Sequence, residues 1–301
     1  MYAEAKMPIP RGMPVFPGMA VFPGMEERWA AVSGGRLRYL VGGSGPSLVL
    51  VHGIAASSFS FRLNCAELMR DFRLHIPDIR LPTADGSLLA TAVRLRDFLD
   101  HLGISRTHIL GSSHGGSAVM ELAALSPERF GRMVLVSPAN PFAQNYKKVV
   151  SFYLSGVGGI FIRLAPLMPG RAWDYGISRM YADRKRISAG TGIGYALPLR
   201  QRGMIPHIVS SLRTLTADIE ALRPKLAAIS KIPTLLIWGD RDPVVELESG
   251  HRLQQALAAE MEVMTGVGHL PYEEDPSEFN RIVRQYLRKS ESGSPDDTSM
   301  G

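Results

Sequence analysis

Cysteine is nearly absent from this sequence, since only Cys65 occurs among its 301 residues. One cysteine can form neither a disulfide within the chain nor a cysteine-based zinc site. This cysteine usage is typical of a reducing compartment, and we expect a cytoplasmic protein. A chain of this length buries enough surface to fold without such crosslinks.

Long apolar runs and a leader pattern are lacking as well. No uninterrupted apolar run approaches the roughly 20 residues of a membrane-spanning helix. The N-terminal stretch contains no cationic segment followed by an apolar one. We therefore expect neither an integral membrane segment nor a signal peptide. The histidines do not cluster at metal-ligand spacing, and we expect no metal.

Acidic residues are scarce in the middle of the chain. Between residues 138 and 222 there are eleven cations and four anions, so this segment supplies the whole net charge of +6. A solvated cationic face is the simplest interpretation, and attraction to anionic lipid or acidic substrates is the alternative. The arginines are scattered without a recognition motif, so we expect no nucleic acid partner.

The two ends of the chain differ in composition from the rest. Residues 1–26 are proline-rich, with methionine at every sixth position from Met7 to Met25. Because proline locks φ, this segment is expected to be an extended arm. The arm either lies on an apolar surface, such as the cap described below or a neighbouring subunit, or is a disordered leader. Residues 290–301 have almost nothing to bury and are expected to form a disordered tail.

Between these ends, short apolar runs alternate with helix-length patterns. Continuous apolar runs predict buried strands at residues 48–51, 109–110 with their neighbours, 133–136 and 234–237. A stripe of apolar residues predicts a helix from Leu88 to Leu102, ended by Gly103, and a second helix is expected after Gly250. This alternation predicts an α/β fold with a mostly parallel central sheet flanked by helices.

Residues 141–216 interrupt this rhythm. Glycine-rich pieces at 156–159 and 190–194 stand between helical patterns there. We expect a mainly helical insertion that caps the ligand-binding edge of the sheet. The core then comprises residues 27–140 and 217–289. The sequence does not decide whether the chain forms a homo-oligomer through the cap or the arm.

The segment Gly111-Ser112-Ser113-His114-Gly115 matches the pattern G-x-S-x-G. It stands between a predicted strand and a predicted helix at 117–125, the strand–turn–helix context in which glycines allow a tight turn that exposes a serine hydroxyl. The helix N-terminus also favours developing negative charge. We interpret Ser113 as a nucleophile, whereas the plainer alternative is a glycine turn with an incidental serine.

A serine hydroxyl needs a base to take its proton, and three further segments could complete such a site. Val51-His52-Gly53-Ile54 ends a predicted strand at a turn that can present a backbone amide. Segment 238–244, which includes Asp240 and Asp242, offers a carboxylate, and segment 266–270 offers the imidazole of His269. The order Ser, Asp, His is the one expected of α/β-hydrolases.

With these four motifs in register, residues 27–289 resemble an α/β-hydrolase of the lipase–esterase and C–C hydrolase type. The resemblance implies Ser113 as nucleophile, His269 as general base and then acid, and Asp242 as the carboxylate that orients His269. It implies that the backbone amides of Ile54 and His114 form an oxyanion hole. It also implies supporting roles for His52, Gly53, Gly111 and Gly115, and no cofactor. Asp240 is the rival carboxylate, which the spacing of the family motif disfavours.

Two departures from the family pattern narrow the expected substrate. The loop at residues 78–87 differs from the usual D-x-x-G-x-G-x-S pattern, and Leu270 stands where C–C hydrolases typically carry tryptophan. A serine at the elbow argues against dehalogenases and epoxide hydrolases, which use aspartate. We therefore expect a serine carboxylesterase acting on a small-molecule ester. The alternatives are a C–C bond hydrolase of the meta-cleavage type and a receptor that retains the site without turnover.

Overall fold

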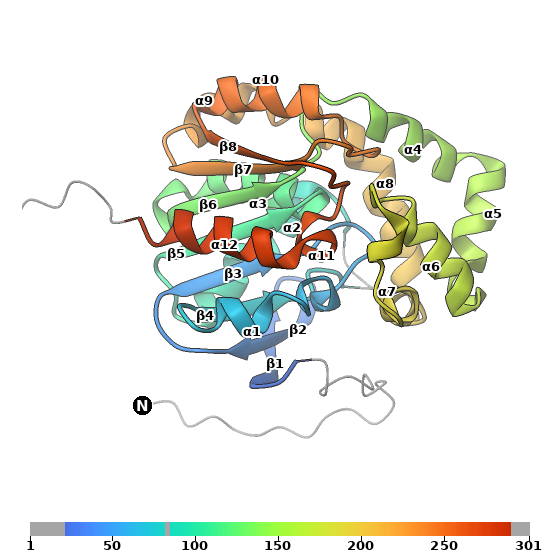
Figure 1. Ribbon diagram of the computed structural model, residues 1–301, viewed down its shortest axis with the longest axis horizontal. Helices are drawn as coiled ribbons and strands as arrows, with labels where there is room; N and C mark the ends of the chain where they lie inside the picture. The colour runs from blue at the N-terminus through green and yellow to red at the C-terminus, as the bar shows by residue number, and fades with distance from the viewer. Residues whose placement is uncertain (1–21, 82–84, 290–301) are drawn as a thin grey trace, which may run out of the picture.

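Eight strands form one sheet in the order β1-β2-β4-β3-β5-β6-β7-β8 in the structure, a computed structural model that describes residues 22–81 and 85–289 (Figure 1). The β1–β2 and β2–β4 pairs are antiparallel, and all others are parallel. The predicted α/β fold with a mostly parallel sheet is confirmed. The strands are β1 (Met25–Val32), β2 (Gly35–Gly42), β3 (Ser47–Val51), β4 (Arg73–Pro77), β5 (Thr107–Ser112), β6 (Phe130–Val136), β7 (Thr234–Gly239) and β8 (Glu260–Met264).

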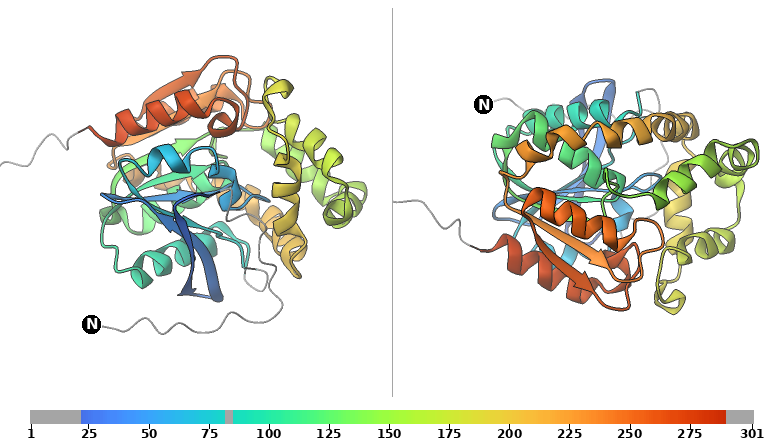
Figure 2. Two further views of the ribbon diagram at one scale, coloured as in Figure 1. Left: turned by 60° about the horizontal axis from the view of Figure 1, so that its bottom comes forward. Right: turned by 90° about the horizontal axis from the view of Figure 1, so that it is seen from above.

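Helices cover both faces of this sheet (Figures 1 and 2). Because both faces are covered, β7 is buried along its whole length and reads as a continuous apolar run. One core cluster joins the sheet to α2 (Leu88–His101), α3 (His114–Leu125), α9 (Leu226–Ile229) and α10 (Leu247–Leu257). A second cluster joins the other face to α1 (Cys65–Leu68), α11 (Pro271–Glu274) and α12 (Pro276–Leu287).

Local signals mark the ends of some helices as the sequence predicts. Ser87 accepts a hydrogen bond from the Ala90 amide at the start of α2, and Gly103 follows the helix with φ of 64°. For α10 the prediction of a start after Gly250 is wrong, because the helix begins at Leu247. Gly250 lies inside it, where a Cβ would come 2.9 Å from the Trp238 ring.

Five α-helices between residues 145 and 220 lie beyond the carboxyl ends of the parallel strands (Figure 1). We call this segment the cap, and its last helix extends four residues past the predicted boundary at 216. Two single-turn 3₁₀ segments lie between the cap helices, η4 (Ala165–Leu167) and η5 (Arg184–Arg186). A third, η6 (Arg223–Lys225), follows the cap. The cap helices are α4 (Asn145–Leu154), α5 (Gly156–Leu164), α6 (Gly170–Ser178), α7 (Thr191–Leu199) and α8 (Met204–Glu220).

The expectation that glycine-rich pieces separate the cap helices is wrong, because most of these glycines lie within α5 and α7. A Cβ on Gly194 would lie 2.1 Å from the Phe59 ring, and one on Gly158 would lie 1.9 Å from the Phe152 carbonyl oxygen. Glycine is used here for close contact between segments, which outweighs its low helix propensity.

Most of the predicted arm, residues 1–21, and the predicted tail, residues 290–301, lie outside the described residues. Phe22 and Met25 are buried with Met69 beside the face that α1 covers. β1 already begins at Met25, so Met25 and Glu26 of the range assigned to the arm belong to the sheet.

The buried imidazole of His75 in β4 is expected to make the folded protein less stable at acidic pH. Neither ring nitrogen of this buried side chain has a hydrogen-bond partner in the described part of the chain. Burial, with the nearby charges of Arg73 and Arg28, lowers the pKa of His75 to about 4 from 6.5. The unfolded chain therefore binds a proton more readily, and stability falls as the pH drops from 6.5 toward 4.

Replacing His75 by leucine should remove this contribution. Between pH 7 and pH 5 the variant should lose about 1–2 kcal/mol less unfolding free energy than the wild type. Urea denaturation at both pH values measures the difference. The exposed His101, changed to glutamine, serves as the control and should behave as wild type. Equal losses in the wild type and the His75→Leu variant would contradict the assignment.

Candidate active site

Ser113 occupies a strained turn between β5 and α3. Its φ of 52° and ψ of −122° are unusual for a residue with a side chain, and such strain concentrates at functional sites. Its amide donates to the Val136 carbonyl of β6 at 2.9 Å. A Cβ on Gly115 would lie 2.3 Å from the His52 carbonyl oxygen, and one on Gly111 would lie 2.7 Å from the Gly116 Cα. The flanking glycines are therefore required by the close approach of α3 to the sheet.

The structure distinguishes the two adjacent serines of the motif. Ser112 is fully buried, and its hydroxyl is 3.4 Å from the Tyr272 hydroxyl. Ser113 is half-buried, and a Cβ on Gly53 would lie 4.0 Å from its Oγ. Ser113 is thus the more accessible of the two serines, and the loop after β3 lies beside it.

His52 holds this loop in place. Its Nδ1 lies 2.9 Å from the Gly53 carbonyl oxygen, and the Ile79 amide donates to its Nε2 at 3.2 Å. Only a neutral imidazole protonated on Nδ1 satisfies both bonds. Burial, together with the charge of Arg80, lowers the pKa of His52 to about 3, which keeps the ring neutral. His52 therefore links the loop after β3 to the segment after β4.

The two amides predicted for the oxyanion hole belong to the turn after β3 and to the first residue of α3. Ile54 lies in a turn closed by the bond from the Ala56 amide to the Gly53 carbonyl, at 3.3 Å. His114 is the first residue of α3, where backbone amides have no acceptor within the helix. Burial, aided by nearby cations, lowers the pKa of the His114 side chain to about 4, so this ring is neutral.

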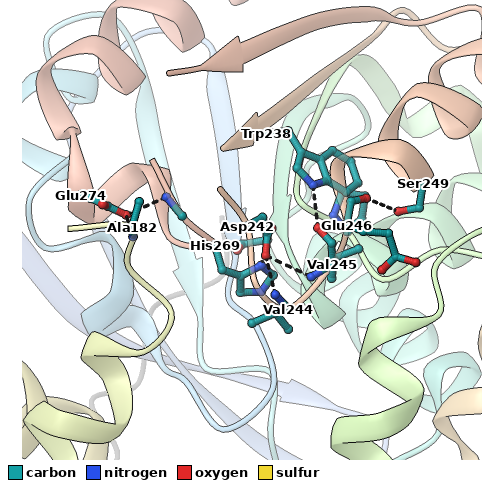
Figure 3. A network of polar contacts seen from close by, with 12 residues as sticks. Ala182, Trp238, Asp242, Val244, Val245, Glu246, Ser249, His269 and Glu274 are labelled. Carbon is teal, nitrogen blue, oxygen red and sulfur yellow. Dashed lines mark hydrogen bonds and ion pairs between the residues drawn. The ribbon is translucent and has the colours of Figure 1, made fainter. Parts of the chain in front are cut away.

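His269 and Asp242 meet after the last two strands of the sheet (Figure 3). His269 Nδ1 lies 2.8 Å from Asp242 Oδ2, and the two side chains are 4% and 0% exposed. The other carboxylate oxygen of Asp242 accepts from the amides of Val244 at 2.8 Å and Val245 at 3.0 Å. These bonds fix the carboxylate against the imidazole.

Asp240, the rival carboxylate, is used differently. Its Oδ1 accepts from the Gly266 amide at 2.7 Å and the Val267 amide at 3.3 Å. It therefore joins the loop after β7 to the loop after β8. The geometry pairs Asp242 with the imidazole and Asp240 with backbone.

Glu274 connects the His269 loop to the cap (Figure 3). It accepts from the amides of Gly268 at 2.8 Å, Ala182 at 3.1 Å and Asp183 at 2.8 Å. The His269 amide in turn donates to the Met180 carbonyl at 2.7 Å. The sequence interpretation missed this residue, although an acidic pair shortly after His269 was a visible signal.

Its neighbour Glu273 anchors the cap a second time. The Glu273 side chain is fully buried and forms an ion pair with Arg62 at 2.9 Å. The Tyr181 hydroxyl donates to it at 2.8 Å, and the Tyr195 hydroxyl donates to its other oxygen. Burial and the Glu273 charge raise the pKa of Tyr181 well above its ordinary value, so this phenol stays a donor. Two cap tyrosines are thus held on one core carboxylate.

Metal ligation has no candidate site in residues 22–81 and 85–289, where no group of three or more His, Cys, Asp or Glu side chains could hold an ion. Cys65 is buried, and burial raises the pKa of its thiol to about 12.

This chain belongs to the alpha/beta hydrolase family, whose model matches residues 48–282. An uncharacterized protein of Mycobacterium tuberculosis is 28% identical over 91% of this chain and 84% of its own length. Lipase 3 of a Moraxella species is 25% identical over 82% and 79%. The 2-hydroxy-6-oxo-6-phenylhexa-2,4-dienoate hydrolase of Comamonas testosteroni is 28% identical over 67% and 69%.

Solved structures share the fold. A membrane phospholipase A described as a bacterial virulence factor superimposes with a TM-score of 0.73 at 22% identity, covering 88% of this chain and 86% of that one. The carboxylesterase CesB of Bacillus subtilis gives a TM-score of 0.69 at 22% identity, covering 89% and 94%. The relatives include ester hydrolases and a C–C hydrolase, so the family alone does not select the substrate.

The two carboxylates after β7 give a direct test of the site. Asp242→Asn should lower kcat for a p-nitrophenyl ester by about 10³–10⁴-fold, because His269 loses its charge partner and its tautomer. Asp240→Asn keeps an oxygen acceptor for the two amides and should cost less than about tenfold. Steady-state kinetics at pH 7.5 measure both. A larger loss in the Asp240 variant would reverse the assignment.

The Glu274 bridge gives a second test. Glu274→Gln turns a three-amide acceptor into a side chain with one oxygen, which should loosen the His269 loop and lower kcat by about tenfold or more. Glu278→Gln, which weakens a solvent-accessible ion pair with Arg281 on α12 away from the His269 loop, is the matched control. Ester kinetics and circular dichroism should separate a positioning defect from unfolding. A folded Glu274→Gln variant with wild-type kcat would exclude the positioning role.

Proposed function

We propose that this protein is a serine carboxylesterase that hydrolyses small to medium hydrophobic carboxylic esters through an acyl-enzyme. The observation that carries the proposal is the buried 2.8 Å bond between His269 and Asp242 in a chain whose elbow presents a half-buried Ser113. The three residues follow β5, β7 and β8, whose carboxyl ends meet at one edge of the sheet.

The proposed reaction proceeds in two halves. His269 takes the proton of Ser113 as its oxygen attacks the ester carbonyl, and the amides of Ile54 and His114 bind the oxyanion. The carbon–oxygen bond to the alcohol then breaks, and His269 gives its proton to the departing alcohol. Water, deprotonated by His269, releases the acid and restores Ser113. Asp242 stabilises the imidazolium in both halves.

An ester specificity agrees with the elbow serine and with lipase and carboxylesterase relatives. A C–C bond hydrolase is the second candidate, because a relative named for that activity is also 28% identical. Leu270 argues against it, since tryptophan is typical at that position in such enzymes. Parallel assays with a p-nitrophenyl ester and a 2-hydroxy-6-oxo-dienoate would rank the two, and kcat/KM should favour the ester by at least about 10²-fold.

The nucleophile can be tested on the serine pair itself. Ser113→Ala should lower ester hydrolysis by at least about 10³-fold with little change in the thermal midpoint. Ser112→Ala removes a buried hydroxyl next to it and should keep activity within about tenfold. A fluorophosphonate probe should label the wild type on Ser113, as read by peptide mass spectrometry. Labelling that persists in Ser113→Ala would point to another nucleophile.

A further inference from the structure

Large apolar side chains are exposed mainly on one part of the cap. Fourteen such residues are exposed in residues 22–81 and 85–289, and eight of them lie between residues 149 and 167. We call these eight side chains the α4–α5 face. They are Val149, Phe152, Leu154, Val157, Ile160, Phe161, Leu164 and Leu167.

The α4–α5 face has helical periodicity but points away from the core. In α5, Val157, Ile160 and Leu164 recur at steps of three and four and are 74%, 61% and 52% exposed. The buried residues of the same helix, Gly158 and Ile162, lie on its other side. An apolar helical stripe normally packs inward, so an outward one of this length marks an interaction surface.

The two helices are held in a bent arrangement at the outer end of the cap, away from the sheet (Figures 1 and 2). Ser155 caps α5 by accepting from the Gly158 amide. The centroid of the Tyr153 ring lies 5.3 Å from that of Phe152, edge to face, and 6.3 Å from that of Phe161. In the described part of the chain no single helix meets the length and composition of a membrane span. The segments 145–154 and 156–167, which comprise α4 and α5 with η4, reach that length and composition only when taken as a pair, and the pair is bent by 81°.

Positive charge accompanies the apolar residues. Residues 145–167 contain Lys147, Lys148 and Arg163 and no acidic residue, and of these cations Lys147 is paired with Glu220 of α8 at 3.2 Å. A hollow of about 380 Å³ opens beside the α4–α5 junction, where the exposed Arg163 and Arg213 stand next to apolar lining such as Ile160. Guanidinium groups at the rim of an apolar hollow suit an anionic headgroup with attached hydrocarbon.

We propose that the α4–α5 face docks the cap on the surface of an anionic phospholipid bilayer. The apolar stripe would enter the boundary between headgroups and acyl chains, and Lys148, Arg163 and Arg213 would contact the phosphates. A bilayer fits better than a second copy of this chain, because a symmetric contact would bring two positively charged faces together.

Docking at this face would hold the cap of the active site at a surface made of lipid esters, a consequence that rests on the proposed function. The cap that carries the face is bonded to the His269 loop through Met180 and Glu274. The docking itself requires no catalysis. Lipid binding and ester hydrolysis can therefore fail independently.

Vesicle flotation with the full chain tests the docking. The wild type should float with phosphatidylcholine vesicles that contain phosphatidylglycerol, and its partition coefficient should be at least about tenfold lower for pure phosphatidylcholine. Ile160→Gln with Leu164→Gln should lower binding by at least about tenfold. The matched control is Leu89→Gln with Leu125→Gln, which replaces two exposed leucines of α2 and α3, outside the cap. This variant should bind vesicles as the wild type does. Arg163→Gln with Arg213→Gln should remove the preference for the anionic lipid.

Several results would overturn the proposal. These are no flotation with either vesicle, equal losses in the cap and control variants, or a wild-type dimer in light scattering that Ile160→Gln with Leu164→Gln makes monomeric. Ser113→Ala should bind vesicles as the wild type does. If no ester is hydrolysed while flotation behaves as expected, the proposed function fails and the docking stands.

Discussion

The close approach of α3 to the ends of β3 and β5 is the constraint on which the site depends. A Cβ on Gly115 would lie 2.3 Å from the His52 carbonyl oxygen, so only glycine permits the helix to start there. Through this contact the start of α3, with the Ser113 turn and its first amide, lies next to the loop after β3. The positive φ of Ser113 is held by neighbours on both sides, since its amide bonds to β6 and its carbonyl accepts from Ser117 at 3.1 Å.

Carboxylates that accept backbone amides organise the loops around this point. Asp242 binds the amides of Val244 and Val245 while it holds His269, and Asp240 binds the neighbouring loop. The same device fastens the cap. Glu246 accepts from the amides of residues 144 and 145 where α4 begins, and Glu274 accepts from those of residues 182 and 183. Charge-assisted bonds to amides thus replace regular secondary structure where the chain must turn toward the site.

Contiguous patterns explain what could be predicted from the sequence. The buried strands and the elbow around Ser113 are each encoded in a few adjacent residues. The preference for Asp242 over Asp240 depended on the resemblance, through the spacing of the family motif after β7. The Glu274 bridge could not be predicted in this way, because its cap partners lie about ninety residues away in the chain. The cap glycines were misinterpreted because glycine disfavours helices in general, whereas Gly194 is required by its contact with Phe59. The outward stripe of α5 has the same periodicity as a buried one, so only the structure reveals its direction.

Trapping of an acyl-enzyme tests the central claim most directly. The wild type would be mixed with a p-nitrophenyl ester, quenched in acid during turnover and digested for mass spectrometry. The account predicts an added acyl group on the peptide that contains Ser113, located on Ser113 by fragmentation, together with a burst of nitrophenol equal to the enzyme concentration when deacylation is slow. Rapid ester turnover with the acyl group on a different residue would contradict it.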